Sequence, residues 1–383
     1  MSFDPRIDPN AERRARTWML VGLAMTCMWP ISSSVRRTER SEAPAPVASP
    51  NGSMEMAQAA TMPRRPAPPA PPAPAELQER LAELGRAFNG RAGIAVRDME
   101  TGWTAAWDGD NLYPQQSVSK LWVAVAVMDA VDRGELSLSD PVTIRPHDLS
   151  VFNQPIRHLV KGPEGYTTTV ARLLNDAITK SDNAANDALM RRVGGADAVE
   201  AVLARKGLTG VRLGAEERYL QTAIAGLNWS PNLLDPDQFE AARDRLPRPQ
   251  RLAARDIYLS DPMDGAKPTA LVEGLARLAQ GELLSPASSA YLIGVMERTR
   301  TGPMRLGGGL PGDWKMAHKT GTGQDLAGET IGYNDIGVLT APDGRRYAVA
   351  VMIAKTGLPQ DKRRQLMHAV SRAVVATHAG EAS

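Results

Sequence analysis

The stretch "SVSKLWVAVAVMDAV" (117–131) decides the fold, because it places a serine and a lysine at the start of a helix that is apolar on every side. Such a helix is typical of the buried centre of a large core. Ser117 and Lys120 are three positions apart and therefore share one helix face. A buried lysine charge is costly without a partner or a function, and an uncharged lysine there can accept the serine's proton. Taken alone, Ser-x-x-Lys is more typical of an ordinary helix start than of a catalytic site.

Two further motifs complete a catalytic set in this chain order. "SDN" (181–183) directly follows a helical pattern, and "KTGTG" (319–323) precedes a strand pattern. The ordered set Ser-x-x-Lys, Ser-Asp-Asn and Lys-Thr-Gly is the signature of class A β-lactamases and penicillin-binding proteins. A second "KTG" (355–357) ends the final predicted strand with no edge strand after it, and we interpret it as a turn.

Through these motifs the chain resembles the class A serine β-lactamase family over most of residues 76–383. "GELLS" (281–285) and "NDIGV" (334–338) extend the resemblance. It implies three groups that move protons or attack: Ser117 as nucleophile, Lys120 as its activating neighbour and Ser181 as proton shuttle to the lactam nitrogen. For substrate binding it implies Asn183 at the side-chain amide, Lys319, Thr320 and Arg363 at the carboxylate, and an oxyanion hole from the backbone N–H groups of Ser117 and Thr322, next to Gly321. A solvated helix face is an equal alternative for Arg363.

The family's deacylating glutamate maps, by the same resemblance, onto "RLGAEERYLQ" (212–221), which begins 31 residues after Ser181. This register assigns the activation of the hydrolytic water to Glu217 and leaves Glu216 as a surface or loop residue. The stretch departs from the family pattern at four positions: Gly214 and Ala215 replace an Asp-Arg pair that braces the loop, Arg218 replaces a proline and Gln221 replaces an asparagine. We therefore expect a poorly braced loop, and slow deacylation is the consequence to test.

Strand patterns at both ends of the domain predict a sheet assembled from the chain ends. "AGIAVRDMETGWTAAWDGD" (92–110) alternates around a Thr-Gly turn, and residues 331–354 give two more strands. A closing helix is predicted at 360–379, with helices between at 169–180, 183–193 and 269–280. The fold class predicted from these elements and the resemblance is α+β and β-lactamase/transpeptidase-like: an antiparallel five-stranded sheet flanked by helices, with an inserted all-helical lobe.

The first 75 residues are predicted to hold a targeting segment and a spacer. A basic flank (13–16), a short apolar run (17–31) and a run of small residues follow the order of a secretory signal. We expect residues 1–40 to be a cleaved signal peptide, with an uncleaved inner-membrane anchor through the apolar run as the alternative. Residues 41–75 are Pro/Ala-rich and are predicted to be an extended linker. The hydrolase domain is expected at 76–383, in a periplasmic or secreted protein.

Charge and cysteine content exclude several classes of protein. Residues 76–383 carry 36 basic and 37 acidic side chains, and a near-neutral domain is a poor nucleic-acid binder. Cys27 is the only cysteine, which excludes a cysteine nucleophile or a thiolate zinc site in the domain. The five histidines show no ligand spacing. We therefore expect no metal, no cofactor and no nucleic acid, and a monomer that acts on a small-molecule β-lactam or a peptidoglycan-like substrate.

Two long stretches near the predicted cleft leave the substrate open. Residues 226–268 are rich in Pro, Arg and Asp and are predicted to form an extra helical flap, and 150–169 contains Phe152, a candidate rim aromatic. We predict a serine β-lactamase that hydrolyses the β-lactam amide through an acyl-serine intermediate, hence β-lactam catabolism and antibiotic resistance. The alternatives are a D,D-peptidase, esterase or amidase of the same fold with little β-lactam turnover, and a non-catalytic penicillin-binding module.

Overall fold

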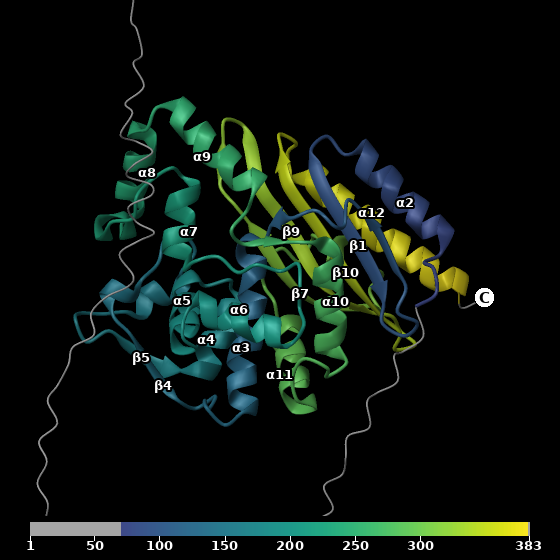
Figure 1. Ribbon diagram of the computed structural model, residues 1–383, viewed down its shortest axis with the longest axis horizontal. Helices are drawn as coiled ribbons and strands as arrows, with labels where there is room; N and C mark the ends of the chain where they lie inside the picture. Colours follow the sequence, from purple (N-terminus) through teal and green to yellow (C-terminus); the bar gives the residue numbers. More distant parts are fainter. Residues whose placement is uncertain (1–69, 382–383) are drawn as a thin grey trace, which may run out of the picture. The chain divides into compact units, whose positions relative to one another are not determined.

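The computed structural model describes residues 70–381 and centres on one antiparallel sheet (Figure 1). Five strands lie in the order β2, β1, β10, β9, β7, and the two-residue β8 pairs with β9 beside this path. The predicted signal peptide and most of the predicted linker lie outside the described residues. The strands of the sheet are β1 (Arg91–Asp98), β2 (Thr104–Trp107), β7 (Lys315–Thr322), β8 (Asp325–Leu326), β9 (Glu329–Thr340) and β10 (Arg346–Thr356).

The two ends of the domain meet in this sheet, as predicted. The early hairpin β1–β2 lies against the late hairpin β9–β10, and β1 pairs with β10 from Ala92 opposite Ile353 to Asp98 opposite Tyr347. Residues 347–354 of β10 are buried on both faces of the sheet, which explains why this strand reads as a continuous apolar run. The whole segment between β2 and β7 is therefore an insertion between two strands of this sheet.

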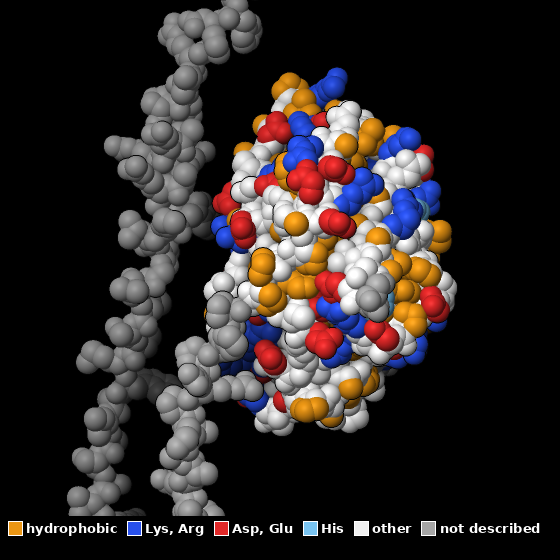
Figure 2. Space-filling view, turned by 90° about the vertical axis from the view of Figure 1, so that its right-hand side faces the viewer, with side chains coloured by type: hydrophobic (Ala, Val, Ile, Leu, Met, Phe, Trp, Pro, Cys, Tyr) orange, Lys and Arg blue, Asp and Glu red, His pale blue; other side chains and the backbone are white. Residues whose placement is uncertain are grey.

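Helices cover both faces of the sheet. In Figure 1, α2 (Ala75–Ala87) and α12 (Gln360–Glu381) lie side by side on one face, while α10 (Pro268–Ala279) crosses β1, β9 and β10 on the other and α11 (Pro286–Glu297) packs on β7. Figure 2 views the side of the molecule where α2 and α12 lie and shows basic and acidic side chains interspersed there. No helix within the described residues is long and apolar enough to cross a membrane.

The inserted lobe is built around α3, whose residues from the first turn to Ala130 are all buried. It packs against α4, α5, α6 and α11, so the helix that is apolar on every side has neighbours on every side. The lobe is helical apart from a ribbon formed by two short strands. Its elements are α3 (Lys120–Asp132), β4 (Pro141–Ile144), β5 (Tyr166–Thr169), α4 (Val170–Thr179), α5 (Asn183–Arg192), α6 (Ala196–Arg205) and α7 (Glu217–Ile224).

The long stretch after α7 folds as two further helices, which confirms that it is helical. These are α8 (Pro236–Arg245) and α9 (Arg248–Ser260), at the top left of Figure 1 next to α7. Asp235 caps α8 by accepting the backbone N–H groups of the first turn, and proline follows it at the first helical position. The chain then returns through β6 (Gly265–Ala266), which pairs with β3 (Tyr113–Pro114) just before the Ser-x-x-Lys motif.

Candidate active site

Ser117 lies in a 3-10 turn, Gln116–Ser119, and the α-helix begins only at Lys120. The sequence predicted one continuous helix start, and the difference arises because the turn is held from outside. Gln116 has a φ of 52°, and its backbone N–H donates to Asp264 Oδ2 over 2.7 Å. Asn334 on β9 donates its side-chain amide to two carbonyl groups just before the turn, at 2.7 and 3.0 Å. The serine is thus fixed relative to both the sheet and the inserted helices.

Lys120 connects the serine to a carboxylate. Its ammonium is fully buried, donates to Ser117 Oγ over 2.7 Å and forms an ion pair with Glu217 Oε1. Burial raises the pKa of Glu217, but the adjacent Lys120 charge and hydrogen bond outweigh it, so the pKa of this carboxyl lies below its usual range. The Glu217 carboxyl is therefore ionised at rest, and each partner of the ion pair offsets the desolvation cost of the other.

Ser181 and Lys319 form the facing wall. Lys319 Nζ on β7 donates to Ser181 Oγ over 3.0 Å, and burial together with the positive charge of Lys120 holds the pKa of Lys319 well below its usual range. Ser181 has a φ of 57° and precedes α5. Asp182 caps this helix through Ala185 N at 3.0 Å, and Asn183 on the first turn donates its amide to Val151 O at 2.8 Å. The Ser-Asp-Asn motif is thus a helix start whose side chains are aimed by hydrogen bonds.

The edge strand β7 contains the Lys-Thr-Gly motif, whereas the sequence placed the motif before a strand. Thr320 Oγ1 lies 2.7 Å from Thr301 Oγ1. Arg305, which the sequence analysis missed, is buried and donates to Gly321 O at 2.8 Å and to Thr322 Oγ1 at 2.6 Å. Nothing in the sequence signals this arginine, because only the folded chain brings it to the strand.

Arg363 is separated from this strand by Arg305 and the ring of Tyr333. Its guanidinium is 5.3 Å from the centroid of Tyr333, its Nε donates to Leu358 O over 2.8 Å, and Arg305 stacks on the same tyrosine at 3.8 Å. Of the two arginines, Arg305 is the one that contacts the Lys-Thr-Gly strand directly.

The segment that carries the glutamates is braced, contrary to the expectation. Glu216 lies in the loop just before α7, as one of the two predicted settings had it, and its side chain is 18% exposed; its carboxylate accepts hydrogen bonds from Arg191 at 2.6 Å and from Arg218 at 2.8 Å. Arg218, which stands where the family has proline, therefore supplies part of a new brace. The sequence could not reveal this pairing, because Arg191 lies on a different helix, α5.

A buried carboxyl supports Glu217 from behind. Asp187 Oδ1 accepts the backbone N–H of Glu217 at 2.9 Å, and its other oxygen accepts the hydroxyl of Ser150 at 2.8 Å. Burial and the nearby negative charge of Glu217 raise the pKa of Asp187 to about 7.

A chain of hydrogen bonds links Glu217 to the inserted helix α9. Gln221 donates to Glu217 Oε2 at 3.1 Å and to Gln116 Oε1 at 3.0 Å, and Gln116 donates to the Tyr258 hydroxyl at 2.7 Å. Tyr258 in turn donates to Asp264 Oδ1 at 2.8 Å. Burial raises the pKa of Asp264 to about 6 and that of Tyr258 well above its usual value. Gln221 therefore holds the Glu217 carboxylate at one end of a chain of hydrogen bonds that reaches the insertion.

A cavity of about 280 Å³ opens onto these groups. Phe152, the predicted rim aromatic, lines it and packs edge-on against Phe239 of α8 at 4.8 Å. Three residues predicted from sequence, Lys120, Ser181 and Lys319, are not part of this lining. Lys120 contacts the lining residues Ser117 and Glu217, and Lys319 contacts Ser181. The lining consists of Ser117, Phe152, Asn153, Asn183, Glu217, Gln221, Arg243, Thr322, Gly323 and Gln324. A larger cavity of about 570 Å³ between α2 and α12 contains none of these residues.

The fold and this site define a serine hydrolase that works by acyl transfer. A hydroxyl nucleophile contacts a lysine, a second hydroxyl contacts a second lysine, and a carboxylate closes the set, which are the parts that covalent acyl transfer and hydrolysis require. Within residues 70–381 no three His, Cys, Asp or Glu side chains gather as a metal site would need.

Comparison with known proteins gives the family. The model of the "Beta-lactamase enzyme family" matches residues 76–378. Beta-lactamase VEB-1 of Pseudomonas aeruginosa is 29% identical over 71% of this chain and 80% of its own, and extended-spectrum beta-lactamase PER-1 of the same organism is 31% identical over 68% and 77%.

Solved structures agree with this family. A beta-lactamase from Chitinophaga pinensis superimposes with a TM-score of 0.65 at 29% identity, covering 79% of this chain and 99% of its own. An ancestral class A beta-lactamase superimposes with a TM-score of 0.63 at 32% identity and the same coverage. The chain therefore belongs to the beta-lactamase enzyme family, and the class A fold and serine β-lactamase function predicted from the sequence are confirmed.

Proposed function

We propose that Ser117 opens the β-lactam ring of the substrate and that Glu217 directs the water that frees the acyl group. The observation that carries this assignment is the continuous contact from Ser117 Oγ through Lys120 Nζ to the Glu217 carboxylate. It supplies a path by which the nucleophile can lose its proton, and the carboxylate lies at the cavity wall where an acyl-serine would sit.

Acylation follows from the positions of four groups. As Ser117 Oγ attacks the carbonyl carbon, its proton moves to Lys120, which passes one of its own to Glu217. The carbon–nitrogen bond of the ring breaks, and Ser181 donates its hydroxyl proton to the departing nitrogen. Lys319, whose pKa is held low, is hydrogen-bonded to Ser181 and can restore that proton. The proton removed from Ser117 then replaces the proton that Lys319 gave to Ser181, so the enzyme–substrate complex as a whole neither gains nor loses a proton.

Deacylation reverses the attack with water. Glu217, again ionised, accepts a proton from a water molecule, and the oxygen of that water attacks the ester carbon. The bond to Ser117 Oγ breaks, the serine regains its proton from Lys120, and Glu217 returns to Lys120 the proton it took from water. Gln221 fixes the second oxygen of Glu217, so the direction of the carboxylate is set before water arrives.

The remaining predicted residues bind the substrate. We assign the substrate's ring carboxylate to Lys319 and Thr320, with Arg305 adding positive charge from behind β7, and leave Arg363 as a second cation one ring further away. Asn183 receives the side-chain amide. Ser117 and Thr322 both line the cavity. Their backbone N–H groups bind the oxyanion, and each such donor is worth on the order of 3 kcal/mol in the transition state. Gly321 keeps this part of β7 clear, since a Cβ there would lie 2.3 Å from Gln115 O.

The place of action follows from the chain's first residues. We propose a periplasmic or secreted enzyme in which residues 1–40 direct export, or anchor the protein through 17–31 if they are retained, and in which 41–75 act as spacer to the domain at 76–383. We propose that it acts as a monomer without a metal or cofactor. Mass analysis of the mature protein from a bacterial periplasm tests cleavage, and sedimentation tests the oligomeric state.

The decisive experiment follows hydrolysis and protein mass together. The purified protein is mixed with a chromogenic cephalosporin, and we expect sustained hydrolysis with a transient acyl adduct on Ser117. A stable adduct without turnover would instead favour a penicillin-binding or peptidase function. Absence of both hydrolysis and adduct would reject the catalytic assignment, provided that the far-ultraviolet spectrum shows a folded protein.

A further inference from the structure

The inserted helix α8 places an arginine without a strong partner at the active-site cavity. Arg243 lines the cavity that also contains Ser117, and its side chain is 25% exposed. Among the described residues its only ion pair is with Asp244 Oδ1 at 3.9 Å, and that carboxylate is itself 67% exposed and accepts a hydrogen bond from Arg251 at 3.2 Å. No hydrogen bond from the Arg243 guanidinium to another described residue is present. Its N–H donors are available to a ligand.

The rest of the cavity lining has no competing charge. Apart from Glu217, one phenylalanine and one glycine, its other members are amides and hydroxyls: Asn153, Asn183, Gln221, Gln324, Thr322 and Ser117. The one acidic member, Glu217, is neutralised by Lys120. Arg243 is therefore the only cation among the lining residues, and it belongs to an element that the sequence marks as an addition to the domain.

We propose that Arg243 binds a carboxylate carried by the acyl side chain of the β-lactam, so that the preferred substrates are dianionic. This rests on the proposed function, in which Lys319 and Thr320 take the carboxylate of the ring system. Arg243 also lines the neighbouring pocket beside Gln324, and Lys319 lines neither of these two cavities. A side chain that extends from an acylated Ser117 past Asn183 toward α8 would bring a carboxylate on its α-carbon toward this guanidinium.

The physical basis is a charge-assisted, two-pronged hydrogen bond. A guanidinium presents parallel N–H groups that match a carboxylate, and the partly buried position reduces screening by solvent. The contact is remote from the reacting bond, so we expect it to stabilise the bound substrate and the transition state equally. Its loss should therefore raise KM more than it lowers kcat.

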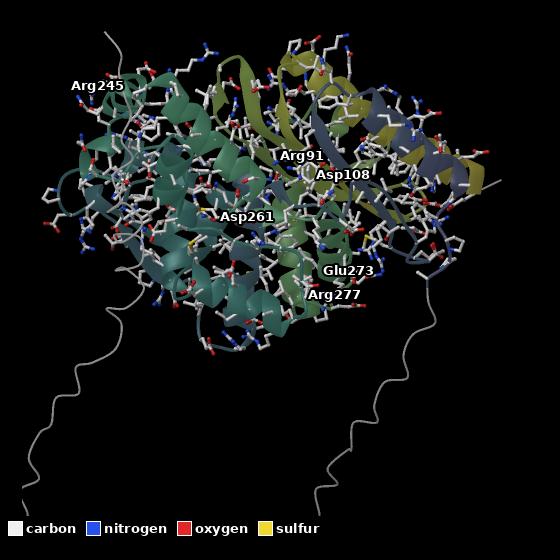
Figure 3. All side chains as sticks on the ribbon, turned by 45° about the horizontal axis from the view of Figure 1, so that its top comes forward. Arg91, Asp108, Arg245, Asp261, Glu273 and Arg277 are labelled. Carbon is white, nitrogen blue, oxygen red and sulfur yellow. The ribbon has the colours of Figure 1, made fainter. Side chains whose placement is uncertain are left out.

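The test uses two penicillins that differ only in this group: benzylpenicillin and its α-carboxyl derivative. Each is hydrolysed by the wild-type protein, by Arg243→Gln and by Arg243→Lys. Arg245→Gln is the matched control, because Arg245 lies on the same helix and is exposed at the outer edge of the molecule (Figure 3). Binding of both intact penicillins is also measured by calorimetry in a Ser117→Ala background.

We expect Arg243→Gln to lower kcat/KM for the α-carboxyl penicillin about tenfold relative to benzylpenicillin. Arg243→Lys should retain part of the preference, Arg245→Gln all of it, and added salt should reduce it. An unchanged ratio in Arg243→Gln, with both penicillins still hydrolysed, overturns the inference while the proposed function stands. If no variant hydrolyses either penicillin, the proposed function fails, and the inference survives only if the Ser117→Ala protein prefers the dianion and Arg243→Gln abolishes that preference.

Discussion

The two walls of the cleft are held in different ways. On the nucleophile wall, Ser117, Ser181 and Lys319 lie at the starts of helices or in an edge strand of the main fold. On the deacylation wall, Glu217 begins a short helix whose position depends on side chains from two other segments: Arg191 and Asp187 of α5, and Gln116 of the turn before α3. The first wall is placed by helix starts and a strand, with side-chain hydrogen bonds from Asp264 and Asn334 at the Ser117 turn, whereas the second depends mainly on a polar network.

This difference indicates which part of the site can tolerate substitutions. A wall that consists of helix starts and a strand keeps its geometry whenever the core is formed, so changes there remove chemistry outright. A wall that consists of hydrogen bonds can be rebuilt with other residues, as the Glu216–Arg191–Arg218 brace shows, and changes there adjust rate and stability. The following predictions test that contrast, from the largest effect to the smallest.

Removal of the nucleophile should stop the reaction at its first step. In Ser117→Ala the hydroxyl is lost, while Lys120 keeps its ion pair with Glu217, so the fold should be unchanged. We expect kcat for a cephalosporin to fall by on the order of 10⁴-fold or more, with no acyl adduct in the mass spectrum. An adduct on another residue in this variant would mean that the nucleophile lies elsewhere.

Removal of the carboxylate should stop the second step alone. In Glu217→Ala we expect the acyl-enzyme to accumulate and kcat to fall by on the order of 10³-fold, because water loses its base while Ser117 and Lys120 remain in contact. Mass spectrometry after rapid quenching measures the trapped fraction.

The neighbouring glutamate gives the control. Glu216→Gln should turn over without trapping but should unfold more easily, by about 1–2 kcal/mol, since two arginines lose a charged partner. Trapping by Glu216→Gln, with turnover in Glu217→Ala, would show that the two roles are exchanged.

Predictability from the sequence followed the same division. The α3 helix and the antiparallel sheet from both chain ends depend on local patterns and were predicted correctly, while the ordered motifs led to Ser117, Lys120, Ser181 and Lys319, which lie in two contacting pairs. The brace at Glu216 and the partner strand of Arg305 depend on contacts between distant segments, and no local pattern encodes them. The expectation of a poorly braced loop failed because the missing Asp-Arg pair was replaced by residues of different spacing.

The insertion should act on deacylation through Tyr258. Tyr258→Phe removes the hydroxyl that joins Gln116 to Asp264, so Gln116 and then Gln221 are less firmly held behind Glu217. Loss of one such hydrogen bond, about 1 kcal/mol, corresponds to about a fivefold fall in the deacylation rate. Stopped-flow measurement should show the acylation rate less affected. Equal slowing of both steps would place the effect at the Ser117 turn and not at the glutamate.

The buried carboxyl behind Glu217 should make stability depend on pH. The pKa of Asp187 is about 7 in the folded protein against 3.8 for an ordinary aspartate, so between these values the folded state binds more protons than the unfolded state. Its contribution to the free energy of unfolding is therefore complete below about pH 4 and is lost as the pH rises to about 7.

Asp187→Asn can still accept the Glu217 N–H and carries no charge. We expect it to be more stable than the wild type by about 1–2 kcal/mol at about pH 8, with the difference shrinking toward about pH 4. Urea unfolding across this range measures both curves, and parallel curves would show that Asp187 stays ionised in the fold.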